Sequence, residues 1–215
     1  VQYTSIQDEH TAVRTAAGLF DVSHMGVLRV EGPFAATYLD SVCGNDISGL
    51  AIGKSCYTHF LTPGGDVIDD LIVYRKANEN FLFVVNASNK DKDWVWLMAV
   101  KDGTVCVDHQ RPKAHAYGRN VLLKDLSDEK YGNEMLIDLA LQGRTSTKIL
   151  LALGTDSETA KSLKQLKRSS LMEGKFGEFE LIVSRTGYTG ENTCYEIFIH
   201  PDQAVAFWNE LLRVG

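Results

Sequence analysis

Several features that would suggest a function at once are missing from these 215 residues. The apolar runs, such as 148–153, are far shorter than the roughly 20 residues needed to cross a bilayer. No G-x-G-x-x-G or G-x-x-x-x-G-K-S/T pattern is present to cradle a nucleotide phosphate. With 22 Lys and Arg against 28 Asp and Glu, the net charge is −6, so no positive field favours nucleic acid or an anionic membrane. These absences favour a small-molecule or protein ligand.

Paired cysteines are missing as well. The four cysteines are widely scattered, without a C-x-x-C pair, and they are Cys43, Cys56, Cys106 and Cys194. We expect reduced structural thiols and no metal site, in a protein of the cytoplasm, or of the mitochondrial matrix in a eukaryote. The composition, 44% hydrophobic and 23% charged, is that of a globular protein with a packed core.

Turn residues and hydrophobic periodicity divide the chain into alternating helices and strands. Thr4 or Ser5 can cap a first helix that ends by Gly18. The other elements expected in the first half are a strand at 27–30, a helix at 34–42, a hairpin of strands 56–62 and 67–74, a strand at 81–85, and a helix from Ser88 or Asn89 through Met98.

The second half repeats this order more loosely. Residues 139–153 resemble 28–42, and residues 179–208 resemble 67–98. The repetition predicts an α+β fold of two related units. The expected divisions are a first unit at 1–107, a polar surface connection at 108–134 with a short strand near 121–123, and a second unit at 135–215.

The strand at 67–74 contains two adjacent acids, Asp69 and Asp70. Because successive strand side chains point to opposite faces, the two carboxylates cannot share one face. An acid in so apolar a strand could face a pocket, where it could hydrogen-bond an amine or exchange a proton with it. It could equally be satisfied by turn amides near Gly64 and Gly65. The residues alone leave both alternatives open.

A second candidate region is the segment 185–191, which places Tyr188 between Gly187 and Gly190. Such a loop could present a ring for stacking on a flat heterocycle, or it could be a hairpin turn whose tyrosine packs on the sheet. In the strand that follows, Glu196 is an acid among aromatic and aliphatic side chains. Its carboxylate could accept paired hydrogen bonds from an amino-pyrimidinone edge.

Asp21, Ser23 and His24 lie close together and suggest a hydrolase triad. Neighbours in sequence do not supply triad geometry, and no G-x-S-x-G elbow is present. We therefore expect His24 to be a polar residue at the entrance of a strand.

Four segments form a specific set when they are taken together. They read GLFDVSHMG at 18–26, GGDVIDDLIVY at 64–74, VVNASN at 84–89 and SRTGYTGE at 184–191. In this order they resemble the signatures of the T-protein, or aminomethyltransferase, family of the glycine cleavage system. The resemblance implies an α+β fold of the folate-binding T-protein type, made of two intertwined units with antiparallel sheets and helices, with folate in a central channel. It also implies that the family's opening segment and C-terminal barrel domain are absent from this chain.

The reaction implied by this resemblance is a folate-dependent aminomethyl transfer. The family takes the aminomethyl group from the lipoyl arm of H-protein, passes its carbon to tetrahydrofolate and releases ammonia. A lipoylated H-protein partner, tetrahydrofolate as co-substrate, no metal and a monomeric state are implied in turn. Carried over by position, the catalytic residue is Asp70, and the folate-binding residues are Tyr57, Val84, Asn86, Tyr188 and Glu196.

Relatives of the same fold leave two alternatives: a folate-dependent demethylase, and a non-catalytic folate-binding factor that assists iron–sulfur assembly. The Gly-Gly-x-x-x-Asp-Asp setting of Asp70 favours the transferase, because an assembly factor would not need that carboxylate. An interaction module that binds no folate is a third alternative. The sequence departs from the family in having Arg144 after Gly143, where a proline is usual, and a longer segment between Glu191 and Glu196.

Overall fold

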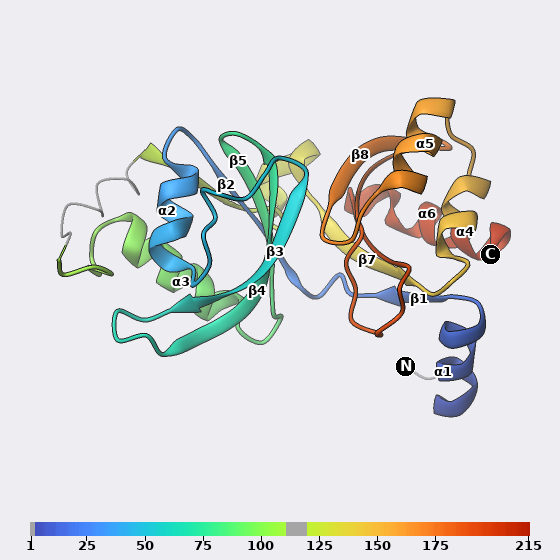
Figure 1. Ribbon diagram of the computed structural model, residues 1–215, viewed down its shortest axis with the longest axis horizontal. Coiled ribbons are helices and arrows are strands. Elements are labelled where there is room, and N and C mark those ends of the chain that lie inside the picture. Colours follow the sequence, from blue (N-terminus) through green and yellow to red (C-terminus); the bar gives the residue numbers. More distant parts are fainter. Residues whose placement is uncertain (1–2, 111–119) are drawn as a thin grey trace. The chain divides into compact units, whose positions relative to one another are not determined.

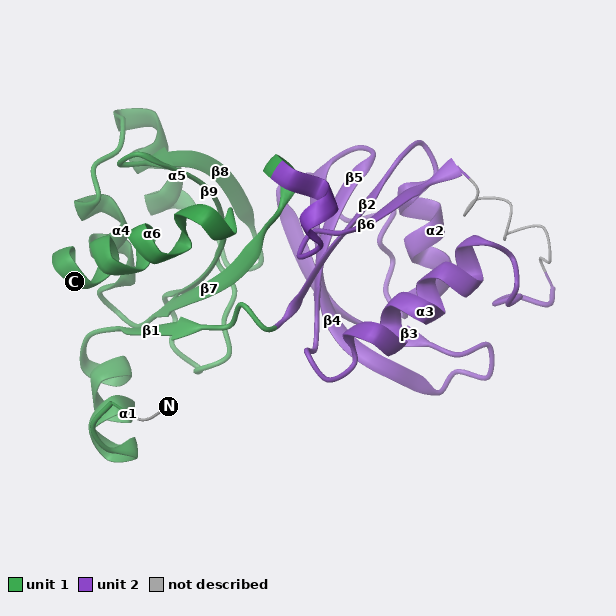
Figure 2. Cartoon of the chain, turned by 180° about the vertical axis from the view of Figure 1, so that it is seen from behind, with its two compact units in different colours: residues 1–24, 133–215 green, residues 25–132 purple. Residues whose placement is uncertain are grey.

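Two compact units make up the chain in the computed structural model, which describes residues 3–110 and 120–215. Residues 25–132 form one unit, which we call the continuous unit (Figure 2). Residues 1–24 and 133–215 form the other, which we call the split unit. Each is described by itself below.

The described residues of the continuous unit form a five-stranded antiparallel sheet and two α-helices (Figure 1). Its strands lie in the order β3-β4-β5-β2-β6. The elements, in chain order, are β2 (Gly26–Glu31), α2 (Ala35–Val42), β3 (Lys54–Leu61), β4 (Val67–Ala77), β5 (Asn80–Val85), α3 (Lys90–Lys101) and β6 (Leu122–Asp125), followed by the 3-10 helix η2 (Glu129–Glu134).

The split unit is also a five-stranded antiparallel sheet, in the order β1-β7-β10-β9-β8. Its elements are α1 (Ile6–Thr15), β1 (Gly18–Asp21), β7 (Ile137–Gln142), α4 (Ser146–Ala152), α5 (Ser157–Gln165), β8 (Leu171–Phe176), β9 (Phe179–Ser184), β10 (Cys194–Ile199) and α6 (Pro201–Val214). Residues 1–24 belong here because β1 pairs with β7, in the register Gly18 opposite Gln142.

Each unit buries an apolar core between one face of its sheet and its helices. In the continuous unit Leu71 and Val73 of β4 pack with Leu97 of α3. In the split unit Tyr195 and Ile197 of β10 pack in the core that includes Phe207 of α6. Because side chains alternate along a strand, the intervening residues occupy the opposite face of each sheet. Asp70 and Glu196 are among these intervening residues, so both point away from the helices.

The two sheets repeat one topology. In each unit a glycine leaves room for the backbone that leads into the edge strand. β7, β8, β9 and β10 follow the same order in space as β2, β3, β4 and β5. The fifth strand is β6 in one unit and β1 in the other. A methyl group on Gly32 would lie 2.5 Å from the carbonyl oxygen of Asn120, and one on Gly143 would lie 2.5 Å from that of Ala16. Both glycines have a φ near +130°, at +123° and +131°, which other residues rarely adopt.

The α+β fold with two antiparallel sheets is confirmed. The first helix begins after Ser5, whose hydroxyl accepts a hydrogen bond from the Asp8 amide. The structure adds β1, α5 and β8, which the periodicity did not indicate. β1 has only four residues, α5 buries only Leu163, and β8 contains a glycine and alternates weakly.

The division of the chain differs from the one expected at 107 and 135. Residues 1–24 pack with the second half because of the β1–β7 pairing. Part of the expected connection at 108–134 lies outside the described residues, at 111–119. After it comes β6, which pairs with β2, and the side chain of Leu123 is buried in the core. The short strand expected near 121–123 is therefore present, as part of a sheet.

The close approach at Gly143 yields a stability prediction. Gly143→Ala should lower the free energy of unfolding by at least about 3 kcal/mol, because the methyl group meets backbone atoms at an already strained φ. Gly154→Ala is the matched control, since its φ is +88° but the space around it is open, and it should cost only about 1 kcal/mol. Urea denaturation of both variants measures the difference. Equal costs would contradict the role given to Gly143.

Candidate functional site

Asp70 lies in the strand β4 with its carboxylate exposed and held on both oxygens. The Tyr57 hydroxyl, from β3, donates a hydrogen bond of 3.1 Å to Oδ2 of Asp70. The side-chain amide of Asn86, just beyond β5, donates one of 3.1 Å to Oδ1. Partial desolvation and the bond to Asp70 raise the pKa of Tyr57, so the phenol remains a donor. The result is an oriented, accessible carboxylate.

Register explains why these side chains meet. Tyr57 pairs with Ile72, and Ile72 pairs with Val84, so both lie on the face that Asp70 shares with Ile72. Tyr57 is 54% exposed, whereas Val84 is buried. Tyr57, Asp70, Val84 and Asn86 are therefore brought together at one place in the continuous unit.

Asp69, the neighbour of Asp70, is buried on the helix side of the same sheet. It accepts hydrogen bonds from the Asn86 backbone amide at 3.3 Å, the Asn86 side chain at 3.0 Å and the Asn89 side chain at 2.5 Å. Burial alone would raise the pKa of Asp69, but these donors outweigh it and lower the pKa. The Asn86 amide also reaches the backbone carbonyl of Asp70, at 3.1 Å. Asn86 thus joins the two acids.

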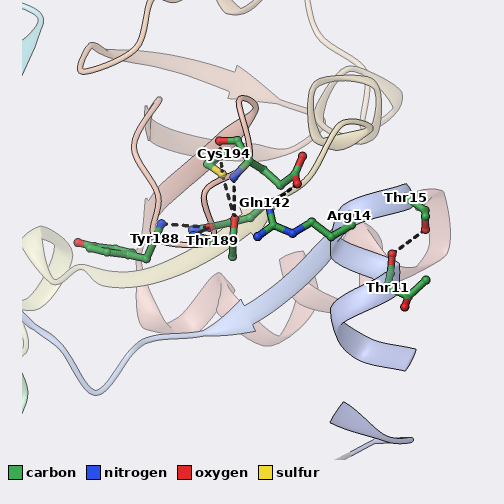
Figure 3. Close-up of polar contacts among 8 residues, drawn as sticks. Thr11, Arg14, Thr15, Gln142, Tyr188, Thr189 and Cys194 are labelled. Atoms are coloured by element: carbon green, nitrogen blue, oxygen red, sulfur yellow. Dashed lines mark hydrogen bonds and ion pairs between the residues drawn. The ribbon is translucent and has the colours of Figure 1, made fainter. Parts of the chain in front are cut away.

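In the split unit the loop after β9 is anchored through a buried glutamine. The backbone amides of Tyr188 and Thr189 each donate to Oε1 of Gln142, at 3.2 Å (Figure 3). Arg14 of α1 pairs with Glu191 at 2.6 Å and holds the other end of the loop. The Tyr188 ring extends away from Gln142 and is 64% exposed.

Glu196 lies on the face of β10 that points away from the helices, and its carboxylate accepts hydrogen bonds from this loop. The Tyr188 hydroxyl donates to Oε1 at 3.3 Å, and the Thr186 hydroxyl donates to Oε2. On the neighbouring strand β7, Asp138 lies diagonally opposite, because it pairs with Phe198. Both acids are only 1% exposed. Burial and the adjacent Glu196 carboxylate raise the pKa of Asp138 well above its ordinary value, which favours the protonated form of Asp138.

The expected site residues thus form two groups, one in each unit. Tyr57, Asp70, Val84 and Asn86 lie in the continuous unit, and Tyr188 and Glu196 lie in the split unit. Sequence reasoning missed the amides of Asn89 and Gln142. It also missed two buried acids, Asp138 and Asp93, the second of which lies in α3 next to Asp69. The sequence did offer one signal for Asp93 and Asp138. Each acid occupies a position where the periodicity of its helix or strand predicts a buried side chain.

The hydrolase alternative finds no support in the geometry. Within the described part of the chain no hydrogen bond joins Ser23 to His24, and His24 is exposed. A cavity of about 820 Å³ lies next to β1 in the split unit, lined by apolar groups such as Ile6, Val13 and Phe20. None of the expected site residues lines it.

Among residues 3–110 and 120–215, no group of three His, Cys, Asp or Glu side chains is placed to hold a metal ion. All four cysteines are free. None of the described helices is long and apolar enough to span a membrane.

Curated relatives match the whole chain. The aminomethyltransferase of Bacillus pumilus (strain SAFR-032) is 39% identical over 215 residues, and that of Halothermothrix orenii (strain H 168 / OCM 544 / DSM 9562) is 40% identical. Both alignments cover 100% of this chain and 52% of the relative. The chain therefore spans about half the length of the curated relatives it matches.

Solved structures agree on the fold. The glycine cleavage system aminomethyltransferase T from Bartonella henselae matches 95% of this chain and 48% of its own, with a TM-score of 0.74 and 30% identity. The heterotetrameric sarcosine oxidase from Corynebacterium sp. U-96 matches 97% of this chain and 89% of its own, with a TM-score of 0.56. At 13% identity that second likeness concerns the fold alone. Residues 1–215 match the GCVT N-terminal domain, and the chain therefore belongs to this family, as its four sequence motifs indicated.

Proposed function

We propose that this chain is the folate-binding part of an aminomethyltransferase of the glycine cleavage system. It transfers the one-carbon unit of aminomethyl-lipoyl H-protein to tetrahydrofolate, with release of ammonia. The observation that carries the proposal is the exposed Asp70 carboxylate, whose two oxygens are oriented by Tyr57 and Asn86. The names of the relatives support the same reaction, since they are aminomethyltransferases.

The proposed reaction needs hydrogen-bond acceptors more than a strong base. The carbon–sulfur and carbon–nitrogen bonds of the aminomethyl group break, and the carbon forms two bonds to nitrogens of tetrahydrofolate. The two hydrogens displaced from these nitrogens go to the lipoyl sulfur and to the departing ammonia. An ionised carboxylate accepts hydrogen bonds from N–H groups and can hold the reacting nitrogens in place. Asp70 supplies such an acceptor without having to be buried.

The residues of the split unit fit the heterocycle of folate. An amino-pyrimidinone edge presents two parallel N–H donors, which match a carboxylate that accepts on both oxygens. Glu196 is such a carboxylate, since its two oxygens accept from the hydroxyls of Tyr188 and Thr186. The exposed ring of Tyr188 offers a face for stacking. We assign Glu196 to the edge of the pterin and Tyr188 to its face.

Removing the charge of Asp70 tests the catalytic assignment. Asp70→Asn in the protein as it occurs naturally should lower kcat by about 100-fold and change KM for tetrahydrofolate by less than about threefold. The amide still fills the space but presents a donor where the reacting nitrogen needs an acceptor. Methylenetetrahydrofolate formation with aminomethylated H-protein measures the effect. Asp66→Asn, an exposed acid in the preceding turn, is the control, and a fully active Asp70→Asn would exclude the assignment.

Folate recognition is tested separately at Glu196. Glu196→Gln should weaken tetrahydrofolate binding by roughly 10- to 100-fold, because one acceptor oxygen is replaced by a donor that faces the donors of the ligand. Calorimetric titration measures the affinity without any need for turnover. Glu180→Gln, an exposed acid in β9, should bind as tightly as the unsubstituted protein. Unchanged affinity in Glu196→Gln would remove the carboxylate from the folate site.

A further inference from the structure

Asp93 is an acid buried in a place that offers its carboxylate no donor. It lies in the first turn of α3 and is 0% exposed. Neither of its carboxylate oxygens receives a hydrogen bond from the described residues. Its backbone amide donates to the carbonyl of Asn89 at 2.8 Å, one turn earlier, and the Asn89 side chain in turn bonds to Asp69 of β4 at 2.5 Å. The group next to the Asp93 carboxyl is therefore another carboxyl, that of Asp69. Two carboxyls can bond to each other only when one of them is protonated, so this pair shares a proton.

The proton resides on Asp93. Asp69 already accepts from Asn86 and Asn89, which stabilise its anionic form. Burial and the bond to Asp69 raise the pKa of Asp93 to about 8. Within the described residues the only other charge that acts on Asp93 is Lys92, which has the opposite and smaller effect. The Lys92 ammonium is itself occupied by the carbonyl oxygen of Ile68, at 2.6 Å.

A continuous set of hydrogen bonds leads from this pair to the site. Asp69, which lies next to the Asp93 carboxyl, accepts from the Asn86 side chain, and the same amide donates to Asp70. Asn89 at the start of α3 uses its side chain on Asp69 rather than as a helix cap. The first turn of α3 is thereby tied to the end of β4 through Asp69.

We propose that Asp93 is a positioning residue, whose carboxylic acid donates to Asp69 and, through Asn86, holds the carboxylate of Asp70 in place. This role rests on the proposed function, since it concerns the Asp70 carboxylate. It adds Asp93, a residue that touches neither substrate. Loss of the proton would place two buried anions side by side, and Asp69 would then turn away from one of its partners. Asn86 would lose its alignment with Asp70.

Two substitutions test whether Asp93 acts as a hydrogen-bond donor or only fills space. Asp93→Asn keeps a donor that cannot be lost at any pH, and Asp93→Leu keeps the approximate size without a donor. In the natural protein, kcat should fall above about pH 8 as Asp93 ionises, with KM for tetrahydrofolate little changed. Asp93→Asn should remove that decline and stay within about threefold at pH 7, and Asp93→Leu should lose at least about tenfold in kcat at every pH. Asp91→Asn, an exposed acid in the same turn, should keep the original profile.

The pH dependence of folding stability tests for the proton on Asp93 without any need for catalysis. The ordinary pKa of aspartate is 3.8, so between about pH 4 and pH 8 the folded chain holds a proton that the unfolded chain has released. The folding equilibrium constant of the natural protein should therefore fall, relative to that of Asp93→Asn, by up to roughly tenfold per pH unit over this range. Below pH 4 and above pH 8 the ratio of the two should become constant.

The side-chain amide resonances of Asn86 in an NMR spectrum report on positioning directly. They should shift with a midpoint near pH 8 in the natural protein and stay constant over that range in Asp93→Asn. The proposal is overturned if Asp93→Leu has normal kcat and unchanged Asn86 resonances, or if Asp93→Asn keeps the alkaline decline. If the natural protein shows no folate-dependent transfer at all, the proposed function fails instead, and the Asn86 resonances still decide whether Asp93 controls the alignment.

Discussion

The side-chain amide of Asn86 is the contact on which the site of the continuous unit depends. Asp69 and Asp70 are adjacent in β4, and strand geometry sends one carboxylate toward the helices and the other to the open face. One nitrogen beyond the end of β5 reaches both of them. An exposed aspartate would otherwise sample several rotamers, and ordering it costs conformational entropy. The sheet, the start of α3 and the buried acid pair together supply that order.

Each of the two sheets is completed by a strand from outside its four-stranded repeat. Each unit has four strands in the same order and takes a fifth from a segment outside that repeat, β6 in one case and β1 in the other. In both units the entering segment passes a glycine with positive φ, where a side chain would collide with its backbone. The chain is therefore intertwined, because residues 1–24 complete the sheet of residues 133–215. Asp21, which the sequence placed near Ser23 and His24, thus belongs to the edge strand of that sheet.

Both units also keep a buried acid pair next to their site residues. Asp93 stands beside Asp69, and Asp138 stands beside Glu196, and in each case burial raises the pKa of the first member. Two buried carboxylates side by side cost free energy unless one of them is protonated. The second member of each pair accepts hydrogen bonds, from the amides of Asn86 and Asn89 in one unit and from the hydroxyls of Thr186 and Tyr188 in the other.

Sequence alone determined the family, the α+β class, most helices and strands, and the opposite orientations of Asp69 and Asp70, because motifs and periodicity are local properties. It could not place β1 in the second sheet or β6 in the first, since short strands have weak local signals and pair with residues far along the chain. Nor could it reveal Asp93 or Asp138, whose importance comes from a second acid that is distant in sequence, 24 residues away for Asp93 and 58 for Asp138. Only the tertiary structure decided which acids meet, because burial and hydrogen bonding depend on packing between elements.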